Sequence, residues 1–318
     1  MSTATRVKTA ILGAALSVVA GAASAADTNQ PISIATIDSS DADFIAHVYG
    51  GLLERYGFNV EYLRIDYTAM IPALETGDLD VSTSIWDTTT WPAVVNAMAD
   101  HTAVIYGSTG VAVQEGWWYP KYLEEVCPGL PDYKALQSEG CVAALATAET
   151  APRGRYIDAP ADWETDSAKR MEALGLDYEV ISSGSTVTMI ASLRAAVDRE
   201  EPVFGFGTQP HWYFDQTPGG FVDLPPNLSS CYDDPAAGPN PEATFDCGFS
   251  VGFVWKMARN GFAEKSPEAA RLLHLFQLEG RDVARATDRI ENGGIPIQQV
   301  AGEWLDAHQD DWKTWPID

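Results

Sequence analysis

The stretch Asp80-Val-Ser-Thr-Ser-Ile-Trp-Asp-Thr-Thr-Thr-Trp-Pro92 decides the fold of this chain. Residues 80–85 alternate in side-chain polarity and are rich in β-branched side chains, which predicts a strand. Pro92 suits the first turn of a following helix. Trp86 therefore stands at the carboxyl end of a strand, where open α/β sheets bind their ligands. Trp86 is a candidate ligand-binding residue, and a large core side chain is the alternative interpretation.

The order of elements around this stretch predicts two similar α/β domains. Strands at 32–37, 59–65 and 80–86 alternate with helical spacing at 44–56 and 69–75, which indicates a mostly parallel sheet with covering helices. The same order is expected again from a strand at Cys141–Thr147 to a strand that runs into Pro210-His-Trp212. Each copy ends with a Trp close to a Pro.

Two β-rich runs, near 108–113 and 248–254, are expected to carry the chain between the domains. The first lobe then comprises residues 26–110 and 251–318, and the second comprises residues 111–250. Helices at 267–277, 281–291 and 297–308 close the chain, with Trp304, Leu305 and Trp312 packing against the first lobe. A cleft between two such lobes is a natural ligand site that can close by a hinge motion.

The N-terminus indicates export. Arg6 and Lys8 precede an apolar run over residues 10–22, and Ala23-Ser-Ala25 fits a cleavage site, so residues 1–25 are predicted to be a signal peptide cleaved near Ala25. The net charge of −25 argues against nucleic acid and anionic membranes as partners. We expect a soluble, monomeric, periplasmic protein.

The four cysteines form two local pairs, and export makes disulfides plausible. Three pairings are formally possible, and sequence proximity favours Cys127 with Cys141 and Cys231 with Cys247. No spacing matches a zinc site, so no metal is assigned.

Catalytic motifs are absent from the sequence, and the aromatic content is distinctive instead. The chain has no nucleophile elbow, phosphate-binding loop, dinucleotide fingerprint or zinc-protease motif, so neither catalysis nor a cofactor is expected. It has ten tryptophans, and aromatic faces attract quaternary ammonium groups. Core or hinge packing is the alternative for the six at predicted strand ends or loops, which are Trp86, Trp91, Trp117, Trp118, Trp163 and Trp212.

The chain resembles the periplasmic binding components of glycine betaine/proline betaine-type ABC importers, which include binders of choline and other methylated amines. The resemblance covers nearly the whole mature chain. It implies a two-lobed type II, Venus-flytrap protein with an aromatic cage in the cleft, a membrane permease as partner, and no catalysis. Its carriers are Ser84-Ile-Trp86, Gly116-Trp-Trp-Tyr-Pro-Lys-Tyr122, Pro160-Ala-Asp-Trp163, Pro202-Val-Phe204 with Pro210-His-Trp212, and Gly261-Phe-Ala-Glu-Lys265.

Position by position, Trp86 and Trp163 match cage tryptophans of the family. His211 lies in a motif whose His can meet a ligand carboxylate, and Asp43 resembles an acidic residue of choline binders. Thr208 and Asp41 stand where relatives have further tryptophans, which leaves room for a smaller or more polar ligand; Asp41 is equally a candidate helix N-cap. The expected ligand-binding residues are therefore Trp86, Trp163, Trp212, Trp117, His211, Thr208, Asp41 and Asp43.

Three functions compete on these observations. The first is capture of a methylated-ammonium osmolyte of the glycine betaine, trimethylamine N-oxide or choline class for an ABC importer. The second is a periplasmic binding protein for another cationic or amino-acid-like ligand. The third, an exported hydrolase, is the weakest because no nucleophile–base set is visible. Burial of Trp86 and Trp163 on opposite walls of one void distinguishes the binding functions from the hydrolase.

Overall fold

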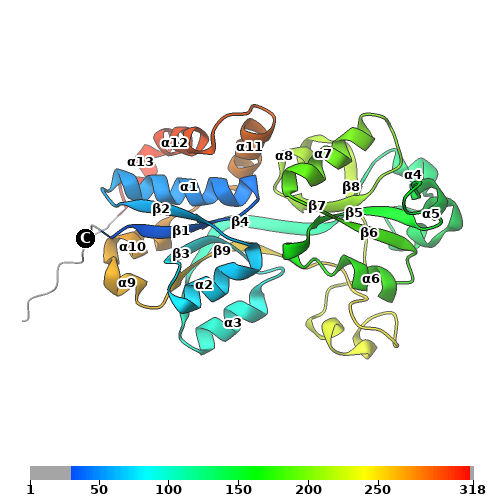
Figure 1. Ribbon diagram of the computed structural model, residues 1–318, viewed down its shortest axis with the longest axis horizontal. Helices are drawn as coiled ribbons and strands as arrows, with labels where there is room; N and C mark the ends of the chain where they lie inside the picture. The colour runs from blue at the N-terminus through cyan, green and yellow to red at the C-terminus, as the bar shows by residue number, and fades with distance from the viewer. Residues whose placement is uncertain (1–29, 316–318) are drawn as a thin grey trace, which may run out of the picture.

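The computed structural model describes residues 30–315, so the predicted signal peptide lies outside the described residues. The described chain forms one sheet in the order β2-β1-β3-β9-β4-β7-β5-β6, with β8 paired to β4 and helices on both faces (Figure 1). The strands are β1 (Ile32–Thr36), β2 (Val60–Arg64), β3 (Val81–Trp86), β4 (Ala103–Pro120), β5 (Gly154–Pro160), β6 (Tyr178–Ser183), β7 (Gly205–Gln209), β8 (Gly219–Phe221) and β9 (Val251–Arg259).

The two ends of the sheet share one topology. At one end β1 pairs in parallel with β2 and β3, and β3 pairs antiparallel with β9. At the other end β5 pairs in parallel with β6 and β7, and β7 pairs antiparallel with β4. The structural repeat that the element order predicts is therefore present, and each copy places a topological switch point beside its central strand.

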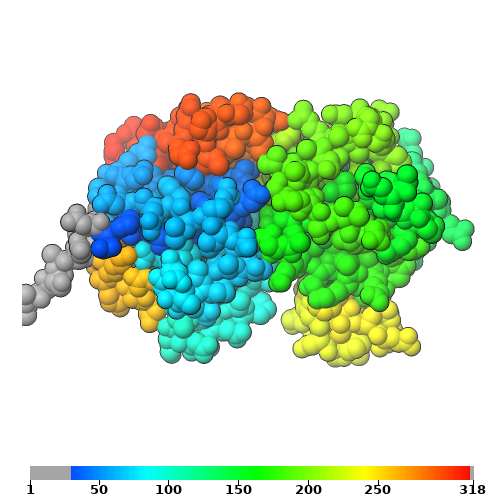
Figure 2. All heavy atoms as spheres, in the orientation of Figure 1, coloured from blue at the N-terminus to red at the C-terminus, as the bar shows by residue number. Residues whose placement is uncertain are grey.

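Two hydrophobic cores flank the middle of the sheet. The first core takes its buried apolar residues from 32–113 and 254–312, which we call the first half. The second core takes them from 117–222, which we call the second half. In Figure 2 the blue atoms of the first half meet the green atoms of the second along a continuous boundary. The exact lobe boundaries, at residues 110 and 250, remain a prediction.

Helices cover the sheet at both ends (Figure 1). The first half carries α1 (Ser40–Arg55), α2 (Met70–Thr76), α3 (Trp91–Ala99), α9 (Phe262–Lys265), α10 (Pro267–Leu275), α11 (Gly280–Glu291), α12 (Ile297–Ala307) and α13 (Gln309–Trp312). The second half carries α4 (Leu123–Val126), α5 (Glu139–Leu145), α6 (Ser167–Ala173), α7 (Thr186–Val197) and α8 (Trp212–Gln216). Leu305 and Trp312 are buried in the first core and Trp304 packs against it, as predicted. Across residues 30–315, no helix combines the length and the apolar character needed to span a membrane.

One predicted strand is wrong. Residues 141–147 were expected to open the second sheet, but Cys141–Leu145 belongs to α5, and β5 opens that sheet instead. The Ser138 side chain caps the helix by accepting from the Cys141 N–H at 3.3 Å, and the alanine-rich run that follows favours a helix.

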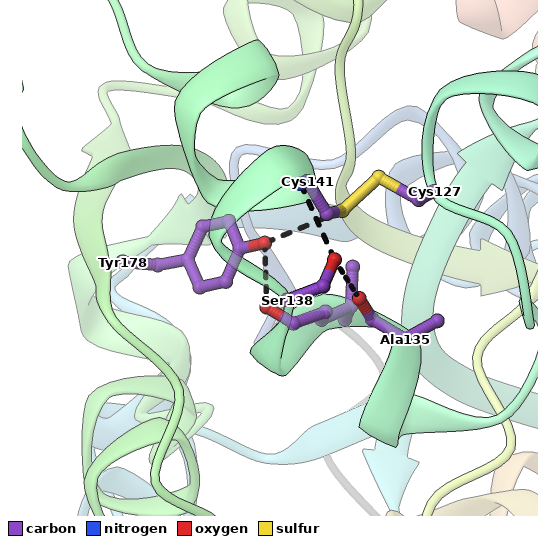
Figure 3. Close-up of a disulfide and its surroundings, with 6 residues drawn as sticks. Cys127, Ala135, Ser138, Cys141 and Tyr178 are labelled. Carbon is purple, nitrogen blue, oxygen red and sulfur yellow. Dashed lines mark hydrogen bonds between the residues drawn. A yellow bond between two sulfur atoms is a disulfide. The ribbon is translucent and has the colours of Figure 1, made fainter.

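Both predicted disulfides are present, Cys127–Cys141 and Cys231–Cys247. Figure 3 shows the first, which ties the end of α4 to α5. Beside it, the Tyr178 hydroxyl donates to the Leu136 carbonyl at 3.0 Å, so β6 holds the same region in place.

Candidate functional site

A pocket with about 300 Å³ of empty space, part of it open to solvent, lies at the carboxyl ends of β1 and β3, where the two halves meet. Its lining comes from the ends of β1 and β3, the start of α1, the loops after β2 and β3, the middle of β4, and the turn after β5. The lining residues are Ile37, Ser39, Asp41, Ala42, Tyr67, Trp86, Thr89, Glu115 and Trp163.

Aromatic rings from both halves form the walls. Trp86 ends β3 and is 7% exposed, while Trp163 ends the single turn Ala161–Trp163 that follows β5. Tyr67 lies 6.4 Å from Trp163 between ring centroids, tilted by 45°. Trp163 packs against both cores, so its position depends on how the halves meet.

Hydrogen bonds hold Tyr67 in place. The Tyr67 hydroxyl is bonded to the Thr89 hydroxyl at 2.9 Å. The Tyr67 backbone N–H donates to the Asp162 carboxylate at 3.2 Å, which links the halves at the edge of the pocket. Trp163 also contacts Phe206, whose ring centroid lies 6.1 Å away with its plane nearly perpendicular.

Two carboxyl groups also line the pocket. Asp41 lies in the first turn of α1, after the N-cap position of Ser39, so the alternative of an Asp41 cap is wrong. Glu115 projects from β4, and one of its oxygens has no hydrogen-bond partner among the described residues. Burial raises the pKa of Glu115 to about 7, Asp41 also raises it, and the Arg170 guanidinium opposes the shift. Glu115 therefore carries a proton for much of the time near neutral pH.

The chemistry of the pocket suits a small organic cation. None of its nine lining residues is a Lys, Arg or His. Ring faces and a carboxylate can both stabilise an ammonium group that has no N–H to donate. A protonated carboxyl can donate one hydrogen bond to an oxygen on the same ligand.

The structure brings three of the sequence-predicted residues together, Trp86, Trp163 and Asp41. Two others lie near the pocket but outside its lining. Thr208 is the register partner of Glu115 in the β4–β7 pairing. Asp43 accepts from the Ile37 N–H at 2.9 Å and lies 3.2 Å from Arg64; burial raises its pKa to about 6 against the effect of Arg64. Asp43 thus braces the turn between β1 and α1.

The remaining predicted residues face elsewhere. Trp117 is fully buried in the second core against Tyr156, Phe204 and Phe249, because its strand faces that core at this position. His211 and Trp212 turn toward Glu291 of α11 rather than into the pocket.

Sequence reasoning missed six lining residues, which are Ile37, Ser39, Ala42, Tyr67, Thr89 and Glu115. Glu115 had a signal, since it is a lone charge between Val113-Gln114 and Gly116-Trp117 in a β-rich run. Tyr67 and Thr89 lie in turns, and no periodic pattern distinguishes such residues from neighbours that face solvent. Within residues 30–315, no group of three or more His, Cys, Asp or Glu is placed to hold a metal ion.

The repeated α/β topology and a small aromatic pocket where two cores meet define a class, the small-molecule binding proteins. Within it, residues 30–307 match the substrate-binding domain of ABC-type glycine betaine transport systems, and the chain belongs to this family.

Individual relatives agree with this assignment. The trimethylamine N-oxide-binding protein of Pelagibacter ubique (strain HTCC1062) is 27% identical over 298 residues, which cover 92% of this chain and 93% of that protein. The glycine betaine/L-proline-binding protein of Borrelia burgdorferi has the same fold, with a TM-score of 0.71 at 18% identity, over 90% of this chain and 96% of that one. Lactococcal OpuAC, solved in a closed form with glycine betaine, gives a TM-score of 0.69 at 16% identity, over 90% and 99% of the two chains.

Proposed function

We propose that this protein captures a small methylated-ammonium osmolyte between Trp86 and Trp163 and delivers it to the membrane permease of an ABC importer. The observation that carries the proposal is the meeting of these two indoles, one from each half, in a pocket that also holds two carboxyl groups. The family is one of substrate-binding domains, which weighs against the hydrolase hypothesis. Export to the periplasm follows from the predicted signal peptide.

Among the candidate osmolytes, trimethylamine N-oxide best matches the chemistry of the pocket lining. Its trimethylammonium group can lie against Trp86, Trp163 and Tyr67, while the Asp41 carboxylate balances the positive charge. Its oxide is a strong acceptor, and Glu115 carries a proton near neutral pH that it can donate. The full-length relative from Pelagibacter ubique that is named for this ligand supports the same choice.

Choline is the second candidate, because it has the same trimethylammonium group and carries no anionic end. Glycine betaine is disfavoured, since its carboxylate would enter a pocket that holds Asp41 and Glu115 and lacks a cationic side chain. The same argument disfavours amino acids. Each ring face contributes about 0.5 to 2 kcal/mol to binding a cation. Together with burial of the methyl groups, such contacts approach the roughly −8 kcal/mol of a micromolar complex.

Calorimetric titration tests the proposal directly. The mature protein is titrated at neutral pH with trimethylamine N-oxide, choline, glycine betaine and dimethylsulfoniopropionate. We expect trimethylamine N-oxide to bind tightest, choline next, and the two carboxylate-bearing ligands most weakly. The control ligand is tert-butanol, which has the shape of trimethylamine N-oxide but lacks its formal positive and negative charges, and it should not bind. Tightest binding of glycine betaine would contradict the electrostatic argument. If none of the four methylated ligands bound, the proposed function would be overturned.

A further inference from the structure

Glu291 is a buried carboxylate whose hydrogen-bond donors come from both halves of the molecule. It is the last residue of α11, and its side chain is 7% exposed. The Trp212 indole N–H donates to one of its oxygens at 2.6 Å. His211 Nε2 lies 3.3 Å from the other oxygen, to which the Ser40 hydroxyl also donates. Ser40 begins α1 in the first half, whereas His211 and Trp212 begin α8 in the second.

The geometry assigns the proton on His211. Its Nδ1 accepts the backbone N–H of Tyr213 at 3.3 Å, which makes the His211 side chain the N-cap of α8. An imidazole nitrogen that accepts carries no proton, so in the neutral ring the proton is on Nε2 and is donated to Glu291. Three side-chain donors therefore converge on one carboxylate, and hydrogen bonds to an ionised group are the strong ones.

Without these donors, Glu291 would be unfavourably placed. A carboxylate at the end of a helix faces the negative end of the helix dipole. Burial also works to raise the pKa of Glu291, but the hydrogen bonds from His211, Ser40 and Trp212 together hold it below its ordinary value. The carboxylate is thus ionised at neutral pH, and removing it would leave the three donors unpaired.

The cluster lies next to the ligand pocket without belonging to its lining. Ser40 stands between Ser39 and Asp41, both of which line the pocket. Helix α11 belongs to the first core through Val283 and Ala286, yet it packs against α8, as Figure 1 shows.

Further contacts place α11 against the second half at both of its ends. A Cβ built on Gly280, its first residue, would lie 3.3 Å from Pro210. Beyond its last residue, Arg194 of α7 donates to the Asn292 side chain at 2.9 Å.

We propose that the Glu291 carboxylate is a built-in tie, which holds the His211–Trp212 turn against α1 and keeps Trp86 and Trp163 at binding distance. Glu291 is a positioning residue, because it acts on the ligand only through the arrangement of the halves. A consequence follows from the three donors: they form a carboxylate site, so removal of the side chain creates a cavity that a free carboxylate such as acetate can fill. Only the affinity measurement below rests on the proposed function.

The first test needs no osmolyte. Small-angle scattering of the ligand-free protein compares wild type with Glu291→Ala, in chloride and in acetate at equal ionic strength. We expect a larger radius of gyration for Glu291→Ala in chloride and a return toward the wild-type value in acetate. Glu303→Ala is the matched control, because Glu303 is 47% exposed and bonds to Arg289 and Gln299, neither of which belongs to the cluster. If Glu291→Ala in chloride had the same radius of gyration as the wild type, the proposed tie would be overturned.

The second test measures affinity for trimethylamine N-oxide. We expect the dissociation constant of Glu291→Ala to rise about tenfold, because part of the binding free energy must then assemble the halves, and to recover in acetate. Glu291→Gln keeps one acceptor oxygen and the side-chain volume, so its dissociation constant should lie between those of the wild type and Glu291→Ala. This variant replaces Glu291→Ala in the test if Glu291→Ala does not fold. Unchanged affinity in both variants, or a loss that acetate does not restore, would contradict the proposal. Failure of the wild type to bind would overturn the function, while scattering still decides the tie.

Discussion

Trp86 and Trp163 differ in what holds them. Trp86 ends a fully buried strand, so its indole is fixed by the first core alone. Trp163 lies in a single turn outside regular strands and packs against both cores. The position of the Trp86 wall is therefore set within the first half, and the position of the Trp163 wall depends on how the halves meet.

Trp86→Ala should weaken binding of trimethylamine N-oxide by about 1 to 3 kcal/mol, which is roughly tenfold to a hundredfold in dissociation constant. The loss combines the ring's attraction for the cation with the burial of the methyl groups. Trp86→Phe keeps a smaller ring face and should lose much less. Trp163→Ala should resemble Trp86→Ala. Fluorescence titration of the purified variants measures each constant.

The control for these variants is Trp312→Phe. Trp312 lies in the first core near the C-terminus, in contact with Tyr56, and does not line the ligand pocket. Its substitution should leave affinity unchanged. Equal affinity for wild type and Trp86→Ala, with the fold intact by circular dichroism, would contradict the cage.

Glu115 predicts a pH dependence of stability. Its pKa is about 7 in the folded protein against an ordinary value of 4.5, so the folded state binds more protons between these values. The free energy of unfolding contributed by Glu115 is fully present below pH 4.5 and is lost as the pH rises to about 7. Relative to Glu115→Gln, the wild type should lose about 3 kcal/mol across this interval. Urea unfolding of both proteins at several pH values measures the difference. If the free energy of unfolding of the two proteins varied with pH in the same way, the raised pKa of Glu115 would be contradicted.

At the scale of elements, the crossing strands β4 and β9 are paired along much of their length, with breaks in register between Ile105 and Ala112. The Thr109 hydroxyl donates to the Val254 carbonyl at 2.9 Å, and the Leu278 N–H donates to the Thr109 carbonyl at 2.7 Å. The segment after α10 is therefore attached to the irregular part of β4. Lys256 of β9 holds the end of α10 by donating to the Phe276 carbonyl at 2.5 Å. The region that joins the halves is thus fastened on both strands.

Two glycines of β4 provide a matched test of this fastening. Gly107 and Gly110 have φ angles of +89° and +88°, so alanine at either position should cost about 1 to 2 kcal/mol of stability. A Cβ at Gly110 would also lie 2.7 Å from the Leu278 carbonyl oxygen, whereas a Cβ at Gly107 would meet nothing within 4 Å. Gly110→Ala should therefore cost about 1 to 3 kcal/mol more than Gly107→Ala. Urea unfolding compares them, and equal losses would mean that Leu278 does not restrain the crossing.

Sequence patterns predicted the helices and strands well where their periodicity and their end signals were clear. The strand ending at Trp86 and the helices from Pro267 onward lie within a few residues of the predicted ranges. The strand prediction for residues 141–147 was wrong because an apolar run this short does not distinguish a strand from a helix. The N-cap at Ser138 favours the helix. Turns that contribute Tyr67 and Thr89 to the pocket carry no pattern, so their role emerges only when distant segments are brought together.

At the scale of the whole molecule, the repeat explains why a site forms where it does. Each half has its switch point beside its central strand, and the turns that follow β1, β3 and β5 converge where the halves meet. The turn after β7 does not line the pocket, because His211 and Trp212 bind Glu291 instead. The family resemblance singled out Trp86 and Trp163, which the structure brings into one pocket, and their contact with a ligand stays a prediction. The resemblance predicted His211 and Trp212 at the ligand, whereas the structure has both side chains hydrogen-bonded to the buried Glu291. This partner could not be inferred from their motif.

The central claim is that one small methylated-ammonium ligand lies between an indole from each half. A crystal structure of the protein grown with trimethylamine N-oxide tests it most directly. We predict ligand density between Trp86 and Trp163, with the oxide oxygen within hydrogen-bonding distance of the Glu115 carboxyl. Ligand bound at any other position, or bound with its oxide turned away from Glu115 toward solvent, would contradict the account.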